Sequence, residues 1–110
     1  MSHQTFGVCI EACQACANAC DHCAAACLRE DDPKPMVDCI AMDMDCAQIC
    51  RLASSFMSRD SVHSAAVCTL CADICDACGK VCSQHPMDHC QACAVACKRC
   101  ADECRRMAAA

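Results

Sequence analysis

The segment CTLCADICDACGKVC, from Cys68 to Cys82, decides the fold of this chain. Its five cysteines follow one another at steps of three, four, three and four residues. Because an α-helix has about 3.6 residues per turn, this spacing puts all five side chains on one stripe of a helix. The same spacing is typical of the buried positions of helical bundles. The segment therefore predicts a helix whose cysteines face the interior.

The other cysteines extend this pattern to three further segments. We call the inward stripe of one helix its seam. The seam positions, in chain order, are Cys9, Cys13, Cys16, Cys20, Cys23 and Cys27; Cys39, Cys46 and Cys50; Cys68, Cys71, Cys75, Cys78 and Cys82; and Cys90, Cys93, Cys97, Cys100 and Cys104. In the second group the seam position between Cys39 and Cys46 is Asp43. We expect all 19 thiols to converge on one long axis.

Proline-containing and polar stretches separate these segments. We predict four helices, at about residues 5–28, 36–57, 61–83 and 88–107. Asp88 and Gln91 have the spacing of a capping box at the start of the last helix. Short connections favour antiparallel neighbours. The sequence thus predicts an all-α chain that forms one domain over residues 1–110, an antiparallel up-down-up-down four-helix bundle with cysteine side chains lining its core.

The composition points to metal rather than to an ordinary apolar core. Cysteine makes up 19 of 110 residues, about 17%, where about 8–10% already marks a cysteine-defined scaffold.

The net charge of −5 and the absence of Trp and Tyr argue against nucleic acid as a binding partner. Residues Met1 to Gly7 lack the pattern of a signal peptide, and no apolar run approaches the roughly 18 residues of a membrane helix. We expect a cytoplasmic protein, in a compartment where cysteine clusters usually bind metal or catalyse.

The cysteines could also act as small apolar residues or form disulfides. A role as a small apolar core residue explains a single buried cysteine, but it does not explain 19 cysteines at the seam positions of four helices. Neighbours three or four residues apart on a helix have Cβ atoms about 5–6 Å apart, whereas a disulfide requires about 3.8 Å. Metal binding is the better interpretation.

The net charge of the filled core indicates which metal the thiols bind. Thiolates are the ligands, and uncompensated charge in a protein interior is costly. A monovalent ion replaces one thiol proton, so a core with about one Cu(I) per cysteine stays near neutral. A zinc ion held by four thiolates leaves two excess negative charges. Soft thiolates also favour Cu(I), so the sequence predicts many Cu(I) ions held by the 19 cysteines.

Two stretches carry a resemblance to a known family. Cys68-Thr69-Leu70-Cys71-Ala72-Asp73-Ile74-Cys75-Asp76-Ala77-Cys78-Gly79 and His89-Cys90-Gln91-Ala92-Cys93-Ala94 resemble the bacterial cytosolic copper storage proteins. The resemblance extends from Cys9 to Met107. It implies a four-helix bundle that stores many Cu(I) ions in its interior, usually as a homotetramer of bundles. With this comes the expectation that copper is exchanged with a copper chaperone, so that free copper stays low.

The two ends of the predicted bundle differ. At one, here called the closed end, the seams continue as Phe6, Phe56, Met57, Ser61, Ser64 and Met107. At the other, the entrance end, lie Cys27, Met36, Cys39, Asp43, Cys82, His85, His89 and Cys90. We hypothesise that Asp43, His85 and His89 form a metal entrance there.

No catalytic motif stands out, and the sequence predicts a storage protein rather than an enzyme. Ser/His/Asp sets, a nucleotide-binding loop and an isolated dithiol beside a strand are all missing from the pattern. Two alternatives remain open from the residues alone. One is a zinc or cadmium thiolate protein of the metallothionein kind, and the other is a thiol–disulfide redox protein.

Overall fold

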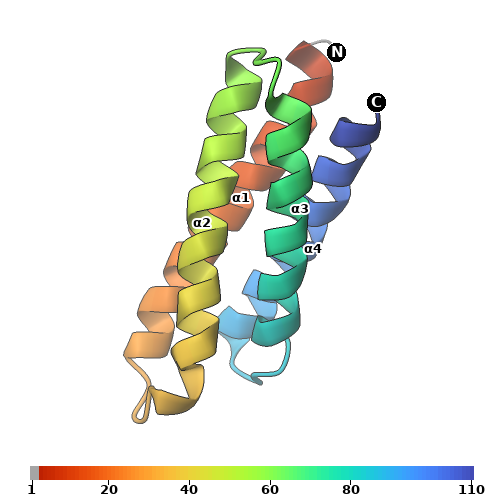
Figure 1. Cartoon of the computed structure of the whole chain (residues 1–110). Coiled ribbons are helices and arrows are strands. Elements are labelled where there is room, and N and C mark those ends of the chain that lie inside the picture. The colour runs from red at the N-terminus through yellow and green to blue at the C-terminus, as the bar shows by residue number, and fades with distance from the viewer. Residues whose placement is uncertain (1–2) are drawn as a thin grey trace.

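In the part of the chain that the structure describes, four α-helices lie side by side along the long axis of the molecule (Figure 1). The computed structural model describes residues 3–110, with side chains from Phe6 onward, and residues 1 and 2 of the predicted domain lie outside this range. The helices are α1 (His3–Leu28), α2 (Val37–Ser58), α3 (Ser64–Cys82) and α4 (Asp88–Ala109), with a 3₁₀ turn, η1 (Lys34–Met36), before α2. The prediction of an all-α bundle with a cysteine-lined core is confirmed.

Successive helices are antiparallel, as the short connections require. Figure 1 shows the N-terminal part of α1, the α2–α3 connection and the C-terminus at one end of the bundle, and the other two connections at the opposite end. α1 and α3 each pack against α2 and α4. The Cα atoms extend over 46 × 18 × 18 Å, so the interior is long and narrow. One of its ends lies beside the α2–α3 connection and the other beside the α1–α2 and α3–α4 connections (Figure 1).

Cysteine and alanine fill this interior. Each of the 19 cysteines is at most 1% exposed, and alanines such as Ala53, Ala72 and Ala101 complete the core. Small side chains let the helices approach closely, and Gly79 shows how closely. A Cβ atom built on Gly79 would lie 3.3 Å from Cys97 Cβ on α4, a tighter contact than most real Cβ pairs make. Glycine at this position therefore permits the contact between α3 and α4.

The third helix begins at Ser64, later than the predicted start at residue 61. Asp60 takes a left-handed conformation with φ of 53°. The Ser61 amide then donates back to the Phe56 carbonyl oxygen at 3.0 Å, and Ser61 Oγ accepts from the His63 amide at 3.1 Å. The residues that follow α2 are thus used to end that helix, and α3 can start only beyond them.

The predicted capping box at the start of α4 is wrong. The N-cap is Met87, which has no side-chain capping bond, and Asp88 is already helical. The Gln91 side chain instead donates to the Ser83 carbonyl oxygen at 3.0 Å and to the His85 carbonyl oxygen at 2.7 Å. Gln91 therefore holds the α3–α4 loop against α4, because backbone acceptors of the loop lie within its reach.

Within residues 3–110, none of the helices combines the length and the apolar character that crossing a bilayer requires.

Candidate metal centre

The cysteine side chains form a continuous network of sulfur atoms. Sγ–Sγ contacts range from 3.1 Å, between Cys39 and Cys82, to 4.0 Å, between Cys46 and Cys50. Cys16 near the middle of α1 is within 3.7 Å of Cys46 on α2 and of Cys97 on α4. All 19 cysteines are free thiols. The seams thus meet across the core as predicted. Sγ–Sγ contacts join 18 of the cysteines, while Cys68 contacts Met57 Sδ at 3.6 Å.

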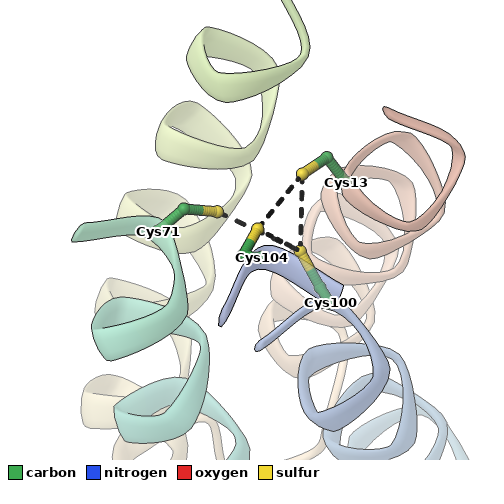
Figure 2. Close-up of side chains that lie close together, drawn as sticks. All are labelled: Cys13, Cys71, Cys100 and Cys104. Carbon is green, nitrogen blue, oxygen red and sulfur yellow. Dashed lines mark hydrogen bonds between the residues drawn. The ribbon is translucent and has the colours of Figure 1, made fainter. Parts of the chain in front are cut away.

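A group of four thiols in Figure 2 shows the local geometry. Cys13 on α1, Cys71 on α3, and Cys100 and Cys104 on α4 point toward one another. Cys100 Sγ lies 3.6 Å from Cys13 Sγ, 3.9 Å from Cys104 Sγ and 4.0 Å from Cys71 Sγ. Three helices therefore supply ligands to one small volume, which suits a soft metal ion or a cluster of such ions.

Groups of this kind recur along the axis. In each, four sulfur atoms lie within 4.8 Å of one another, and several groups share members. Four further ones are Cys16, Cys46, Cys50 and Cys75; Cys16, Cys20, Cys46 and Cys97; Cys20, Cys78, Cys93 and Cys97; and Cys23, Cys27, Cys39 and Cys90. Because neighbouring groups overlap, the arrangement is a continuous ladder of shared thiols rather than a set of separate four-thiol groups.

The interior contains almost no charge that could balance metal-bound thiolates. Among the residues whose burial the structure describes, the buried polar or charged side chains are Asp43, Ser54 and Ser64. Arginine and lysine are confined to the surface, for example in the ion pair between Arg51 and Asp21 at 2.7 Å. A filled core must therefore obtain its neutrality from the bound cations themselves.

Asp43 is fully buried among four thiols. Its Oδ1 accepts from Cys78 at 3.2 Å, Cys93 at 3.2 Å and Cys82 at 3.3 Å, and its Oδ2 lies 3.7 Å from Cys39 Sγ. Burial raises the pKa of this carboxyl from 3.8 to about 9, with smaller contributions from the negative charge of the Cys93 and Cys78 thiolates. Asp43 therefore carries a proton at neutral pH while the core is empty.

Thiols near the entrance end also hold their protons tightly. Burial, followed by the charge of Cys90, raises the pKa of Cys27 to about 11. Burial is likewise the largest cause that raises the pKa of Cys23 and Cys39. A metal ion that binds these groups has to displace protons, so metal uptake and proton release are coupled.

His89 bridges this thiol group and the protein surface. Its Nδ1 lies 3.5 Å from Cys23 Sγ, 3.5 Å from Cys90 Sγ and 3.8 Å from Cys27 Sγ. The side chain is 14% exposed, and its Nε2 lies 3.0 Å from Glu30 Oε1 in the α1–η1 loop. His89 is thus the candidate entrance residue that contacts thiols and also reaches the surface, whereas Asp43 contacts thiols inside the core.

His85 lies apart from the thiols. It belongs to the α3–α4 loop and is half-buried. Within the described residues its hydrogen bonds are made by its backbone, from its amide to the Cys82 carbonyl oxygen and from its carbonyl oxygen to the Gln91 side chain. The structure therefore places His85 near the entrance end without joining it to the network.

Apolar and small residues close the opposite end. Phe6, Met57, Ser64 and Met107 are buried there, as the seam pattern predicts. Phe56 is only half-buried, and the Arg59 guanidinium lies 5.1 Å above its ring. The core is thus sealed by four of the six predicted side chains, while Phe56 and Ser61 belong to its rim.

Comparison with known proteins agrees with this geometry. Residues 2–109 match the family described as copper storage protein. The chain belongs to the copper storage protein family. The resemblance predicted from the cysteine spacing is thereby confirmed, and membership favours storage over catalysis.

Solved structures of copper storage proteins share the fold. A Cu(I)-bound copper storage protein, BsCsp3, is 50% identical with a TM-score of 0.92, and the match covers 94% of this chain and 98% of that one. A cytosolic copper storage protein from Streptomyces lividans, whose structure records copper loading, is 38% identical with a TM-score of 0.94 over 98% of this chain and 95% of that one. A cysteine-rich protein of Bacillus subtilis, YhjQ, is 52% identical over 92% of this chain and 94% of its own length.

Three residues near the thiols were not singled out as site residues from the sequence. Glu30 contacts His89, Met57 contacts Cys68, and Gly79 packs against Cys97. Met57 had a usable signal, since it lies seven residues beyond Cys50 in the seam register. The other two had none, because a loop conformation and a helix–helix approach decide their contacts.

Proposed function

We propose that this chain stores many Cu(I) ions in its interior, about one for each cysteine, with all 19 cysteines as ligands. The observation that carries this proposal is the unbroken thiol network, which lies in a core without buried basic side chains among the described residues. The Cu(I)-bound and copper-loaded relatives support it. Storage of this kind keeps the concentration of free copper low. The stored ions are held for copper enzymes, or to detoxify an excess of copper.

Charge explains why the ion is monovalent. Each Cu(I) that replaces a thiol proton leaves the total charge of the core unchanged, so filling the ladder does not accumulate buried charge. Zinc in the same four-thiolate groups would leave two negative charges at each site. Because the buried side chains of residues 6–110 offer no cation in compensation, repeated zinc sites along the axis are strongly disfavoured.

Copper enters and leaves at the entrance end in this proposal. His89 can take an ion through Nδ1 and pass it to Cys23, Cys27 or Cys90, all within 3.8 Å. Asp43 lies further inside, where its carboxyl can exchange protons with thiols that bind or release copper. His85, in the adjacent loop, is assigned a role only at the outermost step, before the thiols are reached.

We place this storage in the cytoplasm, where thiols remain reduced. The Streptomyces relative described as cytosolic supports this location. A copper chaperone that offers its ion at the entrance end is the partner we propose for loading and release. The exchange would proceed by transfer between thiolates, without free aqueous copper.

A homotetramer is the assembly we propose for these bundles. Leu52 on α2 and Leu70 on α3 are 47% and 52% exposed, and Ile49, Leu52 and Ile74 line a shallow groove between the two helices. Apolar side chains that cluster on one face of a soluble bundle favour contact with another chain. Light scattering after size-exclusion chromatography measures the state directly, and a Leu70→Glu variant should shift it toward the monomer.

Anaerobic titration with Cu(I) against a competing chelator tests the main proposal. We expect a capacity near one ion per cysteine. A capacity near one ion for three or four cysteines, with preference for zinc, would instead support the metallothionein-like alternative.

Loading rates of His89→Ala, compared with those of the exposed control His22→Ala, test the role of His89 in copper entry. Equal rates and equal release for these two variants would refute the assignment of His89.

The redox alternative has a separate test. Mass spectrometry of freshly isolated protein counts free thiols. We expect all 19 to be free, as in the structure. Persistent disulfides within a helix, formed and reduced reversibly without loss of the fold, would support thiol–disulfide chemistry instead.

A further inference from the structure

Met57 occupies a ligand position in the register of α2. The seam of this helix proceeds from Cys39 through Asp43, Cys46 and Cys50, and its next positions are Ala53 and Met57, at the same alternating steps. Both Ala53 and Met57 are fully buried. Met57 thus points into the core at the closed end, where a seam on another helix carries cysteine.

The thioether of Met57 contacts the outermost thiol of α3. Cys68 Sγ lies 3.6 Å from Met57 Sδ, and both side chains are 0% exposed. Within the part of the chain that the structure describes, every other cysteine has a sulfur contact with a second thiol, whereas the sulfur contact of Cys68 is with Met57. Cys104 and Cys9 lie near enough to influence the pKa of Cys68. The last thiol of the ladder therefore has a thioether as its direct partner.

This pair has the geometry and charge of a Cu(I) site. Metal–sulfur bonds of about 2.3 Å allow two ligand sulfurs on one ion to lie up to about 4.6 Å apart, and the observed 3.6 Å falls inside this limit. Thioethers and thiolates both prefer Cu(I). When Cu(I) binds, Cys68 gives up its proton and Met57 gives up none, so the complex is neutral in a region without buried basic side chains among the described residues.

We propose that Met57 is a metal ligand, and that Met57 Sδ and Cys68 Sγ hold the innermost Cu(I) ion of the bundle. The site rests on the proposed storage function and extends it beyond cysteine. It explains how a thiol at the end of the ladder completes its coordination without drawing a ligand from the solvent. It also assigns the closed end a role in binding as well as in sealing the core.

Selenium spectroscopy on the intact protein tests this site. All seven methionines are replaced by selenomethionine, the protein is loaded with Cu(I) to capacity, and X-ray absorption is measured at the selenium edge. We expect a copper neighbour of selenium in the loaded protein. It should vanish in Met57→Leu and persist in the control Met107→Leu, which removes another buried methionine of the closed end. Circular dichroism of each variant reports whether the bundle is intact.

The outcomes separate this inference from the storage function. Loss of the copper–selenium signal in Met57→Leu alone supports the site, together with an affinity for one ion per chain that falls about tenfold or more. A loaded wild-type protein without any copper–selenium signal overturns it, even if Met57→Leu does not fold. A signal that persists in Met57→Leu also overturns it. Failure of the wild-type protein to load copper refutes the storage function instead.

Discussion

His89 Nε2 lies 3.0 Å from Glu30 Oε1, while Nδ1 of the same ring faces three thiols. A carboxylate on one ring nitrogen commonly orients a histidine so that the other nitrogen is presented to a metal. Glu30 belongs to the loop after α1 and His89 to the first turn of α4. The pair therefore ties the α1–η1 loop to α4 across the entrance end, and it holds the ring between the surface and Cys23, Cys27 and Cys90.

Glu30→Gln should slow Cu(I) loading about tenfold, because a neutral amide orients the His89 ring and raises its basicity less than a carboxylate does. The capacity should not change, since no thiol is removed. Stopped-flow measurement of loading at fixed chelator concentration provides the rate. Glu11→Gln is the matched control, because Glu11 is exposed and pairs with Arg99 on the outer surface. Loading of Glu30→Gln at the rate of the control would show that the contact is incidental.

Asp43 should make the stability of the copper-free protein depend on pH. Burial raises its pKa from 3.8 to about 9, so between these values the folded state retains a proton that the unfolded chain releases. The free energy of unfolding should therefore fall as pH rises from about 5 to 8, by at most about 1.4 kcal/mol per pH unit for one proton. Urea unfolding at each pH, compared with Asp43→Asn, measures this slope. A variant as pH-dependent as the wild type would contradict the assignment.

Cys100→Ala should lower both capacity and stability. Cys100 contacts Cys13, Cys50, Cys71 and Cys104, so its loss affects more than one metal ion. We expect a capacity reduced by more than one ion per chain, and a free energy of unfolding of the copper-free protein lower by about 1 kcal/mol. Titration and urea unfolding provide the two values. A loss of only one ion would mean that sites along the ladder do not share ligands.

Copper should stabilise the bundle without changing its helices. Alanines and neutral thiols can pack in the core without a charge that needs metal, so far-UV circular dichroism of the empty and loaded protein should coincide. Binding to the folded state alone raises its resistance to heat, and addition of a strong Cu(I) chelator should reverse the gain. A large increase in helix content on loading would show that metal organises the bundle rather than filling it.

The sequence was sufficient for the fold and for the burial of the thiols. Steps of three and four residues fix which face of each helix is inward, so Cys16 or Cys75 can be assigned to the core from spacing alone. The same periodicity does not determine how a loop folds over a helix end. Glu30 reaches His89, and Gln91 bonds to loop carbonyl oxygens, through conformations that depend on tertiary contacts. The predicted start of α3 at residue 61 was therefore too early, and the capping box of Asp88 and Gln91 does not form, although α4 begins at Asp88 as predicted.

The seal formed by Phe6, Met57 and Met107 affects the order in which stored ions are released. In the proposed arrangement, where copper passes only through the entrance end, the core fills from the closed end and is emptied from the entrance end. Ions taken up early lie deepest and remain there through many cycles of supply and demand, while late arrivals turn over quickly. A brief pulse of isotopically labelled copper given to a partly filled bundle should therefore be returned before the older, unlabelled metal.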